Sequence, residues 1–202
     1  MRDGPAYDIG TPGTPWGLAE RAAWLARQEK RRDFHDDVGA PVQALADRFE
    51  VVQYGVLDCA VGTWPLLGLR TRGWRPDRPT ALITGGVHGY ETSGVHGALR
   101  FARDHAAAHE GRWNLVIAPC VSPWGYETIN RWNPDAVDPN RSFRADSPAA
   151  EARQLMAWVA AQGLRPALHI DLHETTDTDH TEFRPALAAR DGESLSSGPI
   201  PD

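Results

Sequence analysis

Thr84-Gly85-Gly86-Val87-His88-Gly89-Tyr90-Glu91 joins an apolar run at 81–83 to a helix-like pattern that begins at Thr92. Glycine lacks a Cβ, so the glycines of this stretch let the backbone turn sharply. The turn sets an imidazole, His88, and a carboxylate, Glu91, three residues apart. Zinc accepts both ligand types, and two His plus one Glu around an open position is a common hydrolytic site. Because His-x-x-Glu also occurs by chance, the assignment depends on residues further along the chain.

The third ligand is expected at the end of a strand pattern over 166–172. Alternation with a period of two puts the apolar side chains on one face and the polar ones, His169 and His173 among them, on the other. In open α/β sheets, ligands bind at the carboxyl ends of the strands, which favours His173. His169 is the rival ligand, but it lies deeper in the strand. We therefore predict a metal site made of His88, Glu91 and His173.

Strand-like and helix-like patterns alternate along the chain, which predicts an α/β domain. We expect a mixed, mostly parallel and twisted sheet that is flanked by helices. One domain is expected over 1–202, with 1–14 as an irregular arm. The expected strands cover 50–57, 65–70, 80–84, 113–118 and 166–172, the last of them buried. The expected helices begin at Thr14, near Pro41, at Thr92 and at Ser147, which leaves a long loop over 119–146.

The composition excludes several classes of protein. Of the 202 residues, 41% are hydrophobic and 24% are charged, which is ordinary for a globular protein. A net charge of −6 without a basic stripe argues against nucleic acid as a partner. No apolar run approaches the ~20 residues that a membrane span needs, so no membrane association is expected. Two cysteines without a Cys-x-x-Cys pair, and the lack of a secretory signal, favour a cytoplasmic protein.

Several motifs, taken together and in this order, resemble the zinc carboxypeptidase family. The same motifs resemble its relatives, the succinylglutamate desuccinylase and aspartoacylase group. The resemblance runs from about residue 50 to His173, and it implies a zinc carboxypeptidase-like fold. The motifs are His88-x-x-Glu91, a downstream Arg131, Asp138-Pro139-Asn140-Arg141 and Asp171-Leu172-His173.

On the metal side, the resemblance implies that His88, Glu91 and His173 bind one zinc ion per chain. Asp138 would accept the free ring N–H of His88 and so fix its tautomer. For Asp171 two interpretations stay open, a carboxylate that orients a ligand or an ordinary polar residue at a strand end. Zinc would polarise the scissile carbonyl and lower the pKa of its water to about 7.

On the substrate side, the resemblance implies roles for three residues of the long loop. Arg131 would face the negative charge that develops on the substrate oxygen. Asn140 and Arg141 would hold the terminal carboxylate of the substrate, because a planar guanidinium suits bidentate pairing with a carboxylate.

The general base is the point at which the sequence departs from the family. In the family, the general-base Glu lies on a strand well beyond the third ligand, and the sequence given ends at Asp202. Glu174 and Glu182 are the nearest carboxylates, but Glu174 should point away from His173 because neighbouring residues of a strand face opposite sides. We therefore expect a C-terminally incomplete member of the family, without its general base.

The residues and the resemblance together predict a zinc-dependent hydrolase. It would cleave an amide bond next to a free carboxylate, as a metallocarboxypeptidase does on peptides. One alternative is an N-acyl amino acid deacylase on the same scaffold. Another is a non-catalytic module that binds zinc and carboxylates but hydrolyses nothing, and the missing base supports it.

Overall fold

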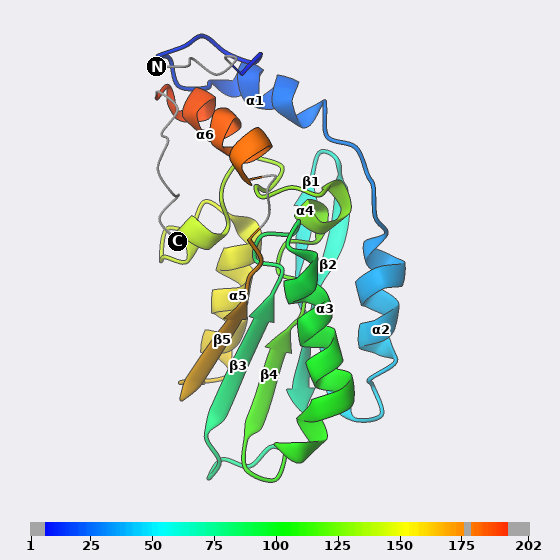
Figure 1. Ribbon diagram of the computed structural model, residues 1–202. Helices are drawn as coiled ribbons and strands as arrows, with labels where there is room; N and C mark the ends of the chain where they lie inside the picture. The colour runs from blue at the N-terminus through cyan, green and yellow to red at the C-terminus, as the bar shows by residue number, and fades with distance from the viewer. Residues whose placement is uncertain (1–6, 176–178, 194–202) are drawn as a thin grey trace. The chain divides into compact units, whose positions relative to one another are not determined.

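The computed structural model, which describes residues 7–175 and 179–193, contains one five-stranded sheet of order β1-β2-β4-β3-β5 (Figure 1). β2 pairs antiparallel with β1 and β4, whereas β3 pairs parallel with β4 and β5, so β2 alone among these strands is reversed. The expected mixed, mostly parallel sheet is confirmed, and each strand lies close to its predicted bounds. The strands are β1 (Phe49–Cys59), β2 (Gly62–Thr71), β3 (Thr80–Gly85), β4 (Asn114–Ala118) and β5 (Leu168–Leu172).

Helices cover both faces of the sheet, and each face has its own apolar core. α2 (Ala40–Gln43) and α3 (Thr92–Arg100) pack on one face, where Ile83 of β3 points into their core. α5 (Ala150–Ala161) packs on the opposite face, and the neighbouring Leu82 points into that core (Figure 1). Because its side chains alternate between two covered faces, all of β3 is buried. β3 therefore holds the turn that follows it in a fixed position.

The segment predicted as an unbroken loop, 119–146, contains a six-residue helix, α4 (Pro123–Thr128), and a 3-10 turn, η4 (Asn140–Ser142). The prediction was wrong here because no amphipathic period marks α4: every residue from 123 to 127 is buried. The local signal was nevertheless present, since Ser122-Pro123 is a typical helix start with Pro in the first turn.

The predicted helix starts are right at α3 and displaced elsewhere. α5 begins at Ala150 because the Ser147 hydroxyl donates to the Ala149 carbonyl instead of capping a helix N–H. Another helix, α1 (Leu18–Leu25), begins four residues after the predicted Thr14, whose N–H closes a turn on Thr11. Short non-α turns precede α2 and extend α3: η1 (His35–Gly39), η2 (Phe101–His105) and η3 (Ala106–Ala108).

β5 is an edge strand, which corrects the prediction that it is buried. Leu168 and Ile170 are 41% and 42% exposed, and both line an apolar groove of about 340 Å³ on the α3 face of the sheet. The alternation of its side chains is as predicted. A period of two identifies the faces of a strand but not what covers them, so the sequence pattern did not reveal the exposure.

The contacts within the chain define two compact units, 29–174, which contains the sheet, and a second made of 1–28 and 175–202. In the second unit, α1 is joined by a π-helical turn, η5 (Asp179–Phe183), and by α6 (Arg184–Asp191). Trp16 is buried there, and its backbone N–H donates to the Arg190 carbonyl over 2.8 Å. Among the described residues, no helix has the length and apolar character needed to cross a bilayer.

Candidate metal centre

The turn after β3 is shaped by glycines at two positions. Gly86 has a φ of +58°, in the left-handed region that favours glycine. At Gly89, a Cβ would lie 2.1 Å from the backbone nitrogen of Tyr126, so only glycine allows α4 to approach the turn so closely. The turn is thereby pressed against α4, and His88 and Glu91 are both 2% exposed.

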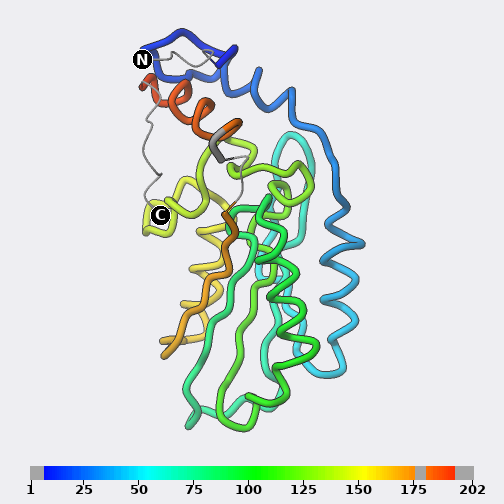
Figure 2. Tube along the Cα trace, in the orientation of Figure 1, coloured from blue at the N-terminus to red at the C-terminus, as the bar shows by residue number. Residues whose placement is uncertain are grey.

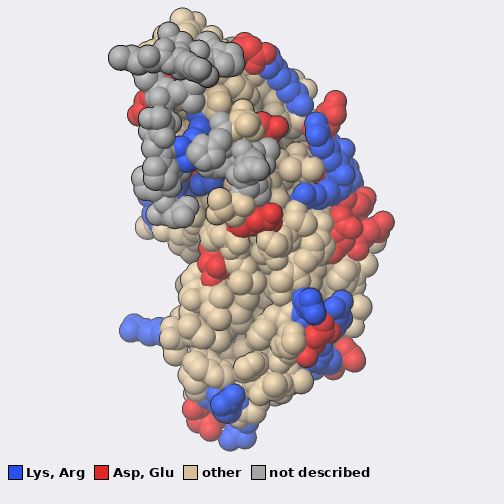
Figure 3. Space-filling view, viewed as in Figure 1, with Lys and Arg blue, Asp and Glu red and all other residues tan. Residues whose placement is uncertain are grey.

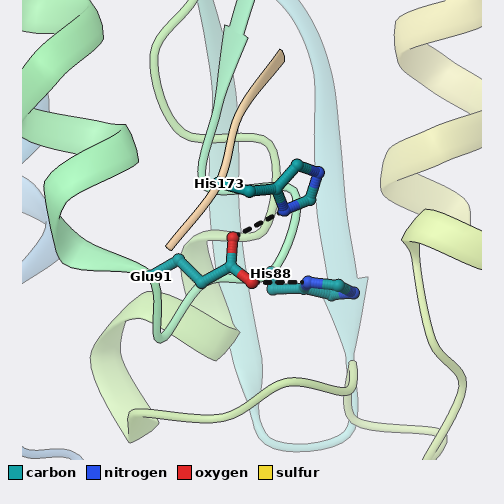
Figure 4. Close-up of side chains that lie close together, drawn as sticks. All are labelled: His88, Glu91 and His173. Carbon is teal, nitrogen blue, oxygen red and sulfur yellow. Dashed lines mark hydrogen bonds and ion pairs between the residues drawn. The ribbon is translucent and has the colours of Figure 1, made fainter. Parts of the chain in front are cut away.

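β3 and β5 run side by side in parallel (Figure 2). At their carboxyl ends, His88, Glu91 and His173 come together (Figure 4). The Glu91 carboxylate lies between the two imidazoles. Its Oε1 is 2.8 Å from His88 Nδ1, and its Oε2 is 2.7 Å from His173 Nδ1. One potential ligand atom from each residue falls within 4.8 Å of the others. The three predicted ligands therefore converge, with the Nδ1 atoms of both rings on the inside.

Each imidazole has a second carboxylate on its outer nitrogen. Asp138 Oδ1 lies 2.9 Å from His88 Nε2, and Asp171 Oδ2 lies 2.8 Å from His173 Nε2. Thr84, on β3, donates its hydroxyl to the other oxygen of Asp171 over 2.6 Å. A carboxylate on the outer nitrogen fixes the tautomer and orientation of a ring whose inner nitrogen is a ligand. For Asp171, this geometry favours the orienting role over that of an ordinary strand-end residue.

The charges of the cluster shift its pKa values in consistent directions. Hydrogen bonds that the His173 ring donates to the carboxylates of Asp171 and Glu91 raise the pKa of His173 to about 10. Burial opposes ionisation of Glu91, but its hydrogen bonds to His173 and His88 hold its pKa below the ordinary value. Asp138 is also buried, and the hydrogen bond and charge of His88, together with Arg131, keep its pKa well below the usual range. Two carboxylates in this cluster, Glu91 and Asp138, therefore stay ionised beside imidazoles.

Arg131 lies next to the cluster and is held in place by Asp138. Its Nε donates to Asp138 Oδ2 over 3.1 Å, so Asp138 links Arg131 to His88. The residue is only 8% exposed. Burial works against its charge, but Asp138 and a hydrogen bond with Tyr90 raise the pKa of the guanidinium above its ordinary value. The turn residue Tyr90 is thus a neighbour of Arg131 that the sequence motifs did not reveal.

The structure places Asn140 and Arg141 beside Asp138 through their backbones. The N–H groups of Asn140 and Arg141 lie 2.9 and 3.4 Å from Asp138 Oδ1. Arg141 is exposed, and Asn140 lines a hollow on the α5 face of the sheet together with Asp171. Both residues therefore border the cluster at its solvent side.

Two other sequence candidates of the same unit, His169 and Glu174, have side chains that bond elsewhere than on the inner face of the cluster. The ring of His169 is hydrogen-bonded to the Thr84 hydroxyl at 3.0 Å. The carboxylate of Glu174 accepts from the N–H and the hydroxyl of Ser93, while its backbone N–H donates to Glu91. Glu182 belongs to the second unit and is exposed.

The loop that carries Arg131 and Asp138 holds two residues with unfavourable backbone angles. Ile129 and Ala136 have φ values of +56°, and they are the non-glycine residues with positive φ in the described chain. Such angles cost of order 1–3 kcal/mol each and persist where the surroundings over-determine them. Neither angle is predictable from the residue types, because Gly or Asn is the usual residue at such positions.

The fold and the cluster define a class of protein: an α/β domain with two imidazoles and one carboxylate converging at the carboxyl ends of parallel strands, the ligand set of catalytic zinc sites. The chain belongs to the succinylglutamate desuccinylase/aspartoacylase catalytic domain family, whose profile matches residues 77–194. The predicted family is thereby confirmed. A search of curated protein sequences gave no significant match.

Solved structures with the same fold include a candidate metallopeptidase from Shewanella denitrificans, at a TM-score of 0.57 and 24% identity over 77% of this chain. Another candidate metallopeptidase, from Shewanella amazonensis, has a TM-score of 0.55 and 22% identity over 83% of this chain. A metallo-carboxypeptidase from Burkholderia cenocepacia has a TM-score of 0.52 and 23% identity over 80% of this chain. The chain spans 63%, 70% and 41% of these three proteins, respectively. The likeness establishes a carboxypeptidase-like fold.

Proposed function

We propose that the chain binds one zinc ion through His88, Glu91 and His173 and acts as an amide hydrolase. The observation that carries this proposal is the convergence of three ligand atoms within 4.8 Å, from residues on two separate strand ends. The donor set fits the metal, because imidazole nitrogen and carboxylate oxygen are both zinc ligands. Bound zinc supplies Lewis acidity, which polarises a substrate carbonyl and activates water near neutral pH.

The residues around the ligands prepare the site for that chemistry. Asp138 and Asp171 hold the outer nitrogens of the two rings, which keeps the inner Nδ1 atoms directed at the metal position. Arg131 carries a fixed positive charge in a buried place next to Asp138. A buried cation stabilises the negative charge that develops on a substrate oxygen far more than an exposed cation does. We assign Arg131 this role.

The substrate proposed is an N-acyl amino acid with a free carboxylate. Family membership favours this class, since the family is that of succinylglutamate desuccinylase and aspartoacylase. Arg141, exposed beside the cluster, and Asn140 are the residues assigned to the substrate carboxylate. A peptide with a free C-terminus is the second candidate, because a solved structure of similar fold is a metallo-carboxypeptidase.

A substrate panel separates these candidates. The zinc-loaded chain is incubated with N-acetyl and N-succinyl amino acids, with dipeptides, and with the same compounds amidated at the carboxylate. We expect hydrolysis of the N-acyl amino acids and none of the amidated forms. Release of amino acids from peptides alone would establish the carboxypeptidase instead, and equal turnover of the amidated forms would remove the roles of Asn140 and Arg141.

Metal analysis tests the site independently of any activity. We expect about one zinc per chain, and a loss of most of it in His88→Ala or His173→Ala. The control is His105→Ala, which removes an exposed imidazole elsewhere in the same unit. Stoichiometric zinc in both site variants would contradict the ligand assignment. Zinc bound as expected, without hydrolysis of any substrate, would identify a non-catalytic metal-binding module, consistent with the fact that we assign no general base.

A further inference from the structure

The turn between Arg131 and Asp138 is organised around one side chain, that of Asn133. Its Oδ1 accepts the N–H groups of Asp135 and Val137 over 3.0 and 3.1 Å. Its backbone N–H donates to the Val137 carbonyl, and its own carbonyl accepts the N–H of Ala136. These bonds close the turn in which Ala136 has a φ of +56°. The spacing between Arg131 and Asp138 therefore depends on where Asn133 lies.

Asn133 is in turn held by Glu151, in the first turn of α5. The Asn133 amide donates to Glu151 Oε2 over 3.4 Å, and both residues are nearly or fully buried. Glu151 Oε1 has no hydrogen-bond partner among the described residues. A buried carboxylate with one unpaired oxygen is costly, and burial accordingly raises the pKa of Glu151 to about 7. A buried acid that contacts neither the cluster nor solvent needs another reason to be there.

We propose that Glu151 is a positioning residue: through Asn133, it holds the 131–138 turn so that Arg131 and Asp138 reach the metal cluster together. The inference rests on the proposed function for its catalytic consequence, but its structural part stands alone. Glu151 belongs to α5, whose Leu155 and Trp158 are packed on the sheet. Through α5, the strained turn is thus held in a fixed position relative to the sheet whose strands β3 and β5 lead to His88 and His173.

Three variants of the zinc-loaded chain test the proposal. Glu151→Asp keeps the carboxyl group but withdraws it by one methylene from Asn133. Glu151→Gln keeps the length and offers a carbonyl oxygen to the Asn133 amide. Gln154→Ala is the matched control: Gln154 lies on the same helix, and its side chain hydrogen-bonds the backbone of Val56 on β1 instead of the turn.

Two measurements are made on each variant: kcat and KM on the best substrate of the panel, and amide hydrogen exchange at Asp135, Val137 and Asn140. For Glu151→Asp, we expect exchange at these amides to rise at least about tenfold and kcat to fall about 10- to 100-fold, with KM and zinc content unchanged. In Glu151→Gln, we expect the exchange rates and kcat to stay near the wild-type values, and Gln154→Ala should change neither.

The outcomes separate this proposal from the proposed function. Unchanged exchange at the three amides in Glu151→Asp would overturn the positioning role, whatever the activity. Equal effects in Gln154→Ala would overturn it as well, because α5 would then act only as a packed helix. If the wild-type chain hydrolyses nothing, the exchange measurement still decides whether Glu151 holds the turn.

Discussion

Asp138 accepts hydrogen bonds from several candidate site residues at once. Its Oδ1 faces His88 Nε2 and the N–H of Asn140, and its Oδ2 faces Arg131. An ionised carboxylate can accept all of these because it has about four lone-pair sites and no proton. Asp138 thus orients His88, a predicted zinc ligand, and positions Arg131, the predicted partner of the substrate oxyanion. It also holds the backbone at Asn140, where the segment predicted to bind the substrate carboxylate begins.

We predict that Asp138→Asn lowers zinc affinity by about 10- to 100-fold, the usual effect of removing a carboxylate partner from a ligating imidazole. The amide can serve His88 or Arg131 as an acceptor, but its NH₂ group repels the other donor. Competition with a chromophoric chelator measures the affinity. Asp146→Asn is the control, since Asp146 lies exposed in the same loop and pairs with Arg144. Equal affinities in the wild type and Asp138→Asn would show that Asp138 does not support His88.

A second prediction at this scale concerns Glu151 and pH. Its pKa rises from 4.5 to about 7 on folding, so between these values the native state binds the proton and the unfolded state does not. Stability from this residue is therefore complete below pH 4.5 and is lost as pH rises through 7, by roughly 3 kcal/mol at about 1.4 kcal/mol per pKa unit.

Denaturant unfolding of the wild type and Glu151→Gln at pH 5, 6, 7 and 8 measures this loss. We expect the difference in unfolding free energy between the two proteins to shift against the wild type from pH 5 to 7 and then level off. Comparison at each pH cancels the contribution of His173, whose raised pKa lies higher, at about 10. A difference that does not change with pH would mean that Glu151 is ionised in the native state.

At the scale of elements, the sequence predicted the strands and the convergence of His88, Glu91 and His173, because the segments involved carry local patterns. Short stretches of sequence identify each of them: an apolar run marks β3, glycines mark the turn after it, and alternation with a period of two marks the polar face of β5. The pairing of β3 with β5 brings His173 to the turn, and the rule that ligands bind at strand ends anticipated it. Family resemblance supplied Arg131 and Asp138.

What the sequence did not predict depends on tertiary packing. α4 is buried all round, so it has no polar face to mark it. The contact between Glu151 and Asn133 joins two segments that carry no shared motif. The positive φ values of Ile129 and Ala136 are imposed by their surroundings, since these residue types avoid such angles when free.

The contact between α3 and β5 gives a prediction at this scale. A Cβ at Gly94 would lie 2.1 Å from the carbonyl oxygen of Leu172, the residue before His173. At Gly97, one turn later, a Cβ would meet only the Leu172 side chain, at an ordinary 3.6 Å. We predict that Gly94→Ala destabilises the chain by roughly 1–3 kcal/mol and weakens zinc binding, because it pushes the end of β5 away from α3.

Gly97→Ala is the matched control, and we expect it to stabilise α3 by up to about 1 kcal/mol with zinc affinity unchanged. Denaturant unfolding gives the stabilities, and chelator competition gives the affinities. Tight zinc binding in Gly94→Ala would show that His173 does not depend on this close approach.

At the scale of the whole molecule, the surface of unit 29–174 is unevenly charged. Figure 3 shows few charged side chains over the part of this face where β3, β4 and β5 lie, and most of its charge near the margins. The apolar groove beside β5 lies on the α3 side of the sheet, with Leu168 and Ile170 in its wall. Edge strands with apolar side chains are sites of unwanted pairing between chains.

We therefore predict that the chain associates reversibly with rising concentration, and that Ile170→Lys suppresses this association. A lysine on an edge strand opposes pairing because an incoming chain would cover its charge on the apolar face of the sheet. Sedimentation velocity over a range of concentrations measures it. Val61→Lys is the control: Val61 is 47% exposed and lies in the turn between β1 and β2, at the opposite end of the strand order from β5. Equal suppression by both variants would assign the effect to net charge.

The cluster unites His88 and Glu91, which are neighbours in the chain, with His173, which lies 82 residues beyond Glu91. During refolding, the first two arrive together with their turn, but the third arrives only when β5 docks beside β3 in parallel. Parallel pairing across such a separation is slow, since a long loop must close before any contact rewards it. Under the proposed zinc assignment, tight metal binding would therefore report the docking of β5, and a metal bound only after that step would slow unfolding without speeding the earlier steps of folding.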